Sequence, residues 1–95
     1  MPHFFLKLIP SRPTFANDMS EAERAIMQLH AAYLAGLLAN GTGIAFGPVM
    51  DPAGTFGMGI VEVADEAAAR AITDNDPASA VARYEIFPMR LLKRD

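Results

Sequence analysis

The sequence predicts one α+β domain in which four strands and two helices follow the order β-α-β-β-α-β. Three observations lead to this prediction. A long amphipathic helical pattern begins at Ser20, a second helical pattern follows Asp65, and short strand-like segments rich in apolar residues surround both. Because 95 residues are enough for one hydrophobic core and too few for two, we expect a single domain over residues 1–95.

The first predicted strand covers residues 3–9, a short run rich in Phe, Leu and Ile that ends at Pro10. The next ten residues, 10–19, contain two prolines and are expected to form a loop, and loops of this length often carry function. Arg12 and Phe15 are its candidate substrate-binding residues. Arg12 is either a surface cation or a group that binds an anion, such as a substrate carboxylate, over the mouth of a pocket.

The long helix is predicted to begin after Ser20, which forms a capping-box pattern with Glu23, and to end at Asn40-Gly41. One broad apolar face contains Ile26, Met27, Leu29, Tyr33, Leu34, Leu37 and Leu38. The opposite face contains Arg24, Gln28, Ala31, Ala35 and Ala39. Its alanines either allow another surface to approach closely or are simply good helix formers.

His30 lies near the centre of the apolar face of this helix. A buried imidazole needs partners for its ring nitrogens, because an unpaired polar group is costly inside a protein. His30 is therefore either a core histidine with its hydrogen bonds satisfied or the acid or base of a site beneath the helix.

The second and third strands are predicted at residues 43–50 and 56–64, joined by a turn at 51–54. Gly47-Pro48 indicates that the second strand bends or lies at an edge of the sheet. On the third strand, Gly57 and Gly59 share one side and leave a groove where another backbone, a helix or a ligand can come close.

Asp65 is expected to cap the second helix, and Asp76 before Pro77 is a good cap for a further helical turn. The fourth strand is predicted at residues 83–92, where Pro88 again indicates an edge or a bulge. This order of elements is the ferredoxin-like arrangement, in which both helices cover one face of a four-stranded antiparallel sheet. Since the strands are apolar on both sides, we expect the second face to be covered by sheet-to-sheet homodimerisation.

The composition narrows the possible functions. Eight basic residues are scattered among eleven acidic ones, which argues against binding to nucleic acid. The chain has no cysteine, which excludes disulfides and thiol chemistry, and two distant histidines give no metal-ligand spacing. Residues 25–50 lack charge but are apolar on one side only, so we expect no membrane span. The beginning of the chain lacks the pattern of a signal peptide, and we expect a cytoplasmic protein.

Several of these segments together resemble the YciI-like family of the dimeric α/β-barrel superfamily. They are Arg12-Pro13, Met19-Ser20-Glu21, His30, Tyr33, Gly47-Pro48, Asp76-Pro77 and the segment 85–90. The resemblance covers nearly the whole chain and implies two ferredoxin-like protomers joined through their sheets. It also implies a site with a histidine and an aspartate, which correspond to His30 and Asp76, similar to that of muconolactone-isomerase-type relatives. A few members are lyase-like or dehydrochlorinase-like enzymes that act on small ring compounds.

Two hypotheses about function remain open. The first is a cofactor-free small-molecule enzyme of isomerase or lyase type, in which His30 and Asp76 form an acid/base pair. In it Tyr33 either donates to a developing oxyanion or is a core aromatic. The second is a non-catalytic dimeric module that binds a small metabolite. A hydrogen bond between His30 and Asp76 beside a cavity would favour the enzyme.

Overall fold

The computed structural model describes residues 1–94. Its elements are β1 (His3–Pro10), α1 (Phe15–Asp18), α2 (Glu21–Ala39), β2 (Gly43–Val49), β3 (Phe56–Glu62), α3 (Glu66–Asp74), the 3-10 helix η1 (Pro77–Ala80) and β4 (Ala82–Met89). The predicted β-α-β-β-α-β order is confirmed, with α1 and η1 added to it. The four strands form one antiparallel sheet in the order β2-β3-β1-β4, as the ferredoxin-like prediction requires.

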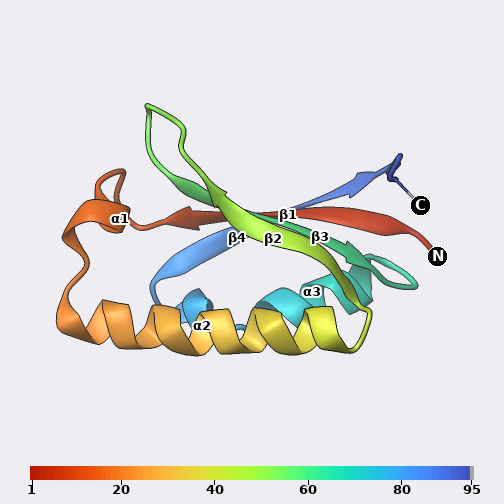
Figure 1. Cartoon of the computed structure of the whole chain (residues 1–95), viewed down its shortest axis with the longest axis horizontal. Helices are drawn as coiled ribbons and strands as arrows, with labels where there is room; N and C mark the ends of the chain where they lie inside the picture. The colour runs from red at the N-terminus through yellow and green to blue at the C-terminus, as the bar shows by residue number, and fades with distance from the viewer. Residues whose placement is uncertain (95) are drawn as a thin grey trace.

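Helices α2 and α3 lie on the same side of the sheet (Figure 1). Within the part of the chain that the structure describes, no helix covers the other side of the sheet. The two sides are called here the inner face, toward the helices, and the outer face. Strand β1 is central and pairs with both β3 and β4. Strands β2 and β4 lie at the edges, which is why each accommodates a proline, Pro48 and Pro88, inside its range.

The core lies between the inner face and α3. Alternation along β1 directs Phe4, Leu6 and Leu8 inward, and these side chains are buried. Val61 of β3 lies beside Phe4 in the sheet, Ala69 of α3 belongs to the same cluster, and neither is exposed to solvent. Burial of these apolar side chains is a main source of the stability of the fold.

The boundaries of α2 follow its predicted capping signals. The Ser20 side chain accepts a hydrogen bond from the Glu23 N–H, and the Glu23 carboxylate accepts one from the Ser20 N–H, which confirms the capping box. At the other end Gly41 has a φ angle of 84°, a left-handed conformation that glycine adopts without strain.

The predicted apolar face of α2 is only partly correct. Leu29 is 60% exposed, and none of the residues of α2 is fully buried. Ala31 and Ala35, which were expected on the back of the helix, instead border a cavity between α2 and the sheet. The physical reason is the rotation of the helix about its axis: the side that faces the sheet is centred near Ala31 and Leu34, so Leu29 points away from it.

Two further predictions need adjustment. The loop expected at residues 10–19 contains the short helix α1, and the turn at Gly54 approaches it, since a Cβ at Gly54 would lie 3.2 Å from Pro13 Cα. Strand β4 ends at Met89 rather than at residue 92, and Leu92 is almost fully exposed. The strands are otherwise within two residues of their predicted limits.

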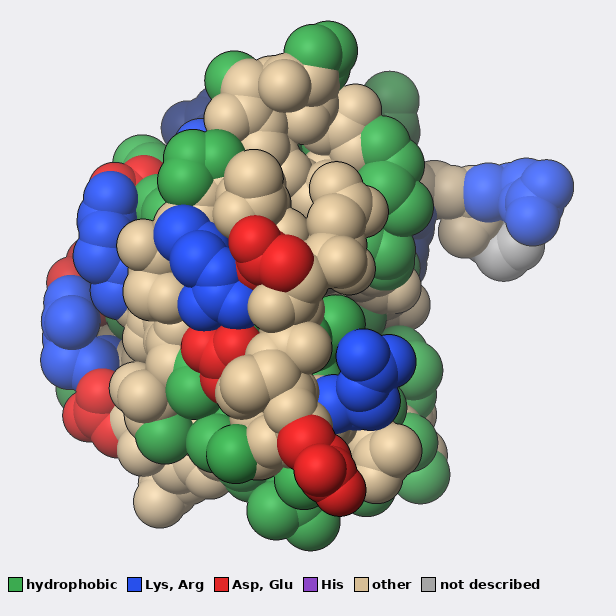
Figure 2. Space-filling view, turned by 90° about the vertical axis from the view of Figure 1, so that its left-hand side faces the viewer, with side chains coloured by type: hydrophobic (Ala, Val, Ile, Leu, Met, Phe, Trp, Pro, Cys, Tyr) green, Lys and Arg blue, Asp and Glu red, His purple; other side chains and the backbone are tan. Residues whose placement is uncertain are grey.

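Among the described residues, no helix combines the length and the apolar character that a membrane span requires. The uncharged run at residues 25–50 divides into most of α2 and all of β2. Figure 2 shows the end of the molecule where basic and acidic side chains are adjacent, with hydrophobic side chains scattered around them.

Candidate active site

Asp76 occupies a fixed position because it caps η1. Its Oδ1 accepts a hydrogen bond of 2.9 Å from the Ala78 N–H, and Pro77 occupies the first turn, so the predicted capping role is confirmed. The cap holds the carboxylate beneath α2, where its side chain has no exposure to solvent. A buried charge of this kind needs several hydrogen-bond donors.

His30 supplies one of these donors. Its Nδ1 lies 2.9 Å from Oδ1 and 2.8 Å from Oδ2 of Asp76, although the two residues are 46 positions apart in the chain. His30 projects from the middle of α2 and its side chain is 12% exposed. The two residues that were proposed as an acid/base pair are therefore in direct contact.

The protonation of the pair follows from the surroundings of Asp76. Burial alone would raise the pKa of Asp76, but hydrogen bonds from His30, Tyr84 and the Ala78 N–H outweigh it and hold the pKa below its usual value. Asp76 is therefore a carboxylate, and the His30 Nδ1 carries the proton between them. The proton on Nδ1 leaves Nε2 of a neutral imidazole with a lone pair, and the hydrogen bonds that His30 forms with the described residues all involve Nδ1.

Tyr84 is a third member of this group that the sequence analysis did not single out. Its hydroxyl donates to Asp76 Oδ2 from β4. Burial, followed by the hydrogen bond to Asp76 and its charge, raises the pKa of Tyr84 above its usual range, so the hydroxyl stays protonated. Alternation along β4 could have identified it. Tyr84 is two positions from Ile86, so both side chains point to the inner face, and the exposed side chain of Arg83 points the other way.

A cavity of about 450 Å³ lies between α2 and the inner face, with His30 and Tyr84 in its wall. Three of its lining residues carry polar side chains, His30, Thr55 and Tyr84, and none of the described lining residues is charged. The apolar part of the wall comes mainly from β1, α1, α2, β2 and β3, for example Leu8, Phe15, Met27, Leu34 and Phe46. Such a cavity suits a small, largely apolar molecule with one group directed at the imidazole.

The two glycines of β3 explain part of the shape of the cavity. Both Gly57 and Gly59 line it, and the ring of Phe46 packs directly over Gly59, where a Cβ would lie 2.8 Å from Phe46 Cδ1. The groups that approach these glycines are thus side chains, not the backbone or helix that was expected, and a ligand beside them stays a prediction.

The predicted substrate-binding residues lie in different places. Phe15 of α1 is 3% exposed and forms part of the cavity wall. The Tyr33 hydroxyl donates to the Ile72 carbonyl at 2.7 Å, and Tyr33 is not among the residues that line the cavity. Burial, and to a lesser extent the charge of Asp76, raises the pKa of Tyr33. A substrate-binding role for Phe15 and for Tyr33 stays a prediction.

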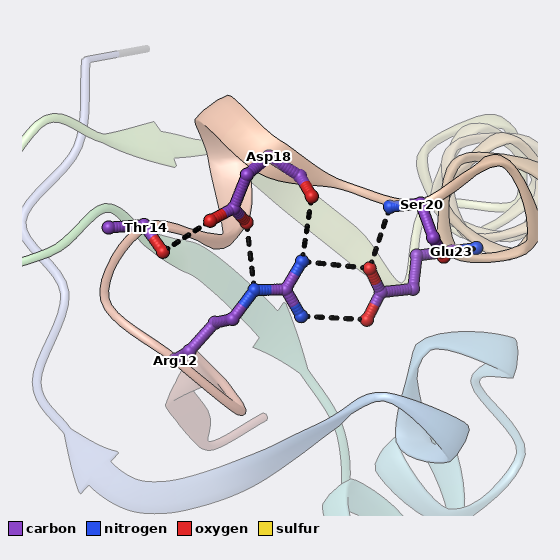
Figure 3. A network of polar contacts seen from close by, with 5 residues as sticks. All are labelled: Arg12, Thr14, Asp18, Ser20 and Glu23. Atoms are coloured by element: carbon purple, nitrogen blue, oxygen red, sulfur yellow. Dashed lines mark hydrogen bonds and ion pairs between the residues drawn. The ribbon is translucent and has the colours of Figure 1, made fainter.

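Arg12 lies outside the cavity wall, in the network that Figure 3 shows. Its guanidinium forms a two-pronged contact with the Glu23 carboxylate, with both distances 2.9 Å, and its Nε and Nη2 also reach the Asp18 carboxylate and carbonyl. These contacts hold the pKa of Glu23 at about 2. The network attaches the loop and α1 to the first turn of α2, and a substrate-binding role for Arg12 stays a prediction.

Metal-binding residues were sought among the same side chains. Within the described part of the chain, no three His, Asp or Glu side chains gather closely enough to hold a metal ion. His3, the other histidine, lies on β1 with its Nε2 3.1 Å from Glu62, and it does not line the cavity.

Comparison with known proteins adds to this geometry. A family model described as the YCII-related domain matches residues 3–90. The chain belongs to this family. The YciI-like resemblance found in the sequence is thereby confirmed, and the match spans every strand and helix of the YCII-related domain. No curated protein matches the chain.

Among solved structures, the YCII-related domain is similar to 5-chloro-2-hydroxyhydroquinone dehydrochlorinase (TftG) from Burkholderia phenoliruptrix, in complex with 2,5-dihydroxybenzoquinone. The TM-score is 0.67 at 18% sequence identity, and the match covers 92% of this chain and 93% of the other. At this identity the likeness shows the shared ferredoxin-like fold.

Proposed function

We propose that this YCII-related domain is a cofactor-free enzyme that transfers a proton on a small molecule in an isomerase-type or lyase-type reaction. The observation that carries the proposal is the pairing of the His30 Nδ1 with the buried Asp76 carboxylate at the wall of an apolar cavity. A neutral imidazole held in this way presents its other nitrogen as a base.

In the proposed reaction, Nε2 of His30 accepts a proton from a carbon next to a carbonyl group or from a ring hydroxyl. The electron pair of the broken bond forms a new double bond. In an isomerisation the imidazolium then returns the proton to another atom of the same molecule, and in an elimination a leaving group departs with its bonding electrons. Asp76 stabilises the imidazolium while it exists, as the carboxylate does in other histidine-carboxylate pairs.

The proposed ligands are small ring compounds. A cavity of about 450 Å³ with a mostly apolar wall has the size and character for one such ring. The similarity to a dehydrochlorinase that holds 2,5-dihydroxybenzoquinone supports this class. Thr55, on the side of the cavity formed by the β2–β3 hairpin, is available to orient a polar substituent.

The test is a thermal-shift screen with hydroxylated and quinone ring compounds, including 2,5-dihydroxybenzoquinone, followed by turnover assays of the hits. We expect His30→Gln to lower turnover by roughly 10²–10⁴-fold, the usual contribution of a general base. His3→Gln changes the only other histidine, which is outside the cavity, and should leave turnover unchanged. Equal turnover in wild type and His30→Gln would contradict the proposal. Binding without turnover in the wild type would support the non-catalytic module instead.

We also propose that the functional unit is a homodimer formed through the outer faces of two sheets. Phe5 pairs in register with Ile60 and Phe87, so these three side chains share the outer face, and the rings of Phe5 and Phe87 stack at 5.9 Å. Phe87 is 44% exposed in the single chain. An apolar sheet face of this kind is typical of a surface that a partner covers. A cytoplasmic location and the absence of a nucleic-acid partner stay predictions from the sequence.

A further inference from the structure

Tyr84 has a special place among the donors to Asp76. The Ala78 N–H belongs to the helical turn that Asp76 itself caps, and His30 is the proposed base. The Tyr84 hydroxyl is the remaining side-chain donor to this carboxylate within the described residues, and it comes from a different element, β4. Tyr84 also borders the cavity, but it reaches His30 only through Asp76.

We propose that Tyr84 is a positioning residue that, through Asp76, lowers the proton affinity of His30 and keeps the Nε2 lone pair free near neutral pH. The inference rests on the proposed role of His30 as a proton acceptor. It assigns a function to a residue whose ring would otherwise count only as part of the cavity wall.

The physical reason is competition for the charge of the carboxylate. A hydrogen bond donated by Tyr84 draws electron density from Oδ2, which weakens the attraction between Asp76 and a protonated His30. Without this hydroxyl, the carboxylate interacts more strongly with the imidazolium, and His30 stays protonated to a higher pH. An imidazolium cannot accept the proton of a substrate.

The other charged and titratable groups near His30 are not placed to change its proton affinity through Asp76. Tyr33, on the same helix, directs its hydroxyl to the Ile72 carbonyl, and Glu23, two turns earlier, is paired with Arg12. The described residues of the sheet and of α1 that line the cavity carry no charge. Asp76 and Tyr84 are therefore the groups that we expect to set the titration of His30.

The experiment is an NMR titration of the His30 ring, with its signals assigned by comparison with His3→Gln, since the chain has two histidines. In Tyr84→Phe, the pH at which the His30 signals are half-shifted should rise by roughly 0.5–1 unit, because one hydrogen bond to the carboxylate is lost. The control is Tyr33→Phe, which removes the only other tyrosine hydroxyl, one that contacts Ile72 rather than Asp76. It should move the midpoint by less than roughly 0.2 unit.

An unchanged midpoint in folded Tyr84→Phe would overturn the inference, as would an equal shift in Tyr33→Phe. If Tyr84→Phe does not fold, 3-fluorotyrosine introduced in the Tyr33→Phe background provides a second measurement. Its more acidic hydroxyl is a stronger donor, so the midpoint should fall, and a rise or no change would overturn the inference. Because these titrations need no substrate, a failure to find turnover would count against the proposed enzyme and not against the coupling of Tyr84 to His30.

Discussion

At the scale of single residues, Asp76 links the local backbone to the site. One oxygen caps η1 through the Ala78 N–H, and both oxygens contact His30 Nδ1. Capping and pairing therefore use the same carboxylate, so the position of the proposed base depends on a helical turn that was recognisable from Asp76-Pro77 alone. Asp76 can therefore act as a helix cap and as the partner of the proposed base at the same time.

Asp76 should make the stability of the fold depend on pH in the acid range. Its pKa is lowered in the folded protein, so its contribution to the free energy of unfolding is present above the pKa of an unfolded aspartate, about 3.9. The contribution is lost as the pH falls through the lower folded value. We expect Asp76→Asn to reduce the free energy of unfolding at pH 6 by roughly 1–3 kcal/mol.

The same variant should also show a flatter dependence on pH below about 4 than the wild type. Urea unfolding followed by circular dichroism between pH 6 and pH 2.5 measures both effects. Asp74→Asn, which changes an exposed aspartate at the end of α3, is the matched control. A parallel loss of stability with acid in wild type and Asp76→Asn would contradict the prediction.

At the scale of elements, the packing of β2 on β3 depends on Gly59. A Cβ at this position would lie within 3 Å of two ring atoms of Phe46, whereas a Cβ at Gly47 of β2 would meet nothing within 4 Å. Gly59→Ala must therefore displace the Phe46 ring, which lines the cavity, while Gly47→Ala need not move any neighbour.

We expect Gly59→Ala to lower the free energy of unfolding by roughly 1–3 kcal/mol, the usual cost of overpacking. Gly47→Ala should leave it unchanged or raise it by up to about 1 kcal/mol, because alanine restricts the unfolded chain. Urea unfolding of the two variants side by side makes the comparison. Equal stability of both would show that Phe46 moves aside freely.

The elements also show which features could be predicted from the sequence. Signals carried by neighbouring residues, such as the Ser20–Glu23 capping box and Asp76-Pro77, led to correct helix starts. The exposed position of Leu29 depends on which side α2 turns to the sheet, and the role of Tyr84 depends on which side chain meets Asp76. Both are set by contacts between distant parts of the chain, and the periodicity within one element does not predict such contacts.

For the site, the His30–Asp76 pairing was inferred from the family resemblance, and the structure brings the two side chains together. Arg12 illustrates the opposite case. A guanidinium in a long loop is consistent with anion binding, but the carboxylates of Asp18 in α1 and Glu23 in α2 are within its reach and bind it. The competition between a ligand and nearby carboxylates cannot be settled by spacing in the sequence.

At the scale of the whole molecule, the proposed homodimer leads to a prediction about Phe87. Replacing this exposed outer-face residue by glutamate would place two charges in the interface, so Phe87→Glu should weaken association by roughly tenfold or more. Leu29→Glu, at a position that is also exposed but on α2, should not affect it. Sedimentation velocity over a range of micromolar concentrations distinguishes the cases. A wild-type protein that is monomeric throughout would exclude the dimer.

Helix α2 carries His30 and much of the cavity wall, yet none of its residues is fully buried. The tightly packed residues, such as Leu6 and Val61, lie in the sheet instead. Leu6 borders the cavity as well, so the wall has two parts: a tightly packed part on the sheet and a part on α2 whose side chains stay accessible. If the cavity holds the ligand of the proposed enzyme, substitutions at Met27 or Leu34 on α2 should change which molecules enter while the core residues of the sheet stay the same, so that single mutations give access to new specificities.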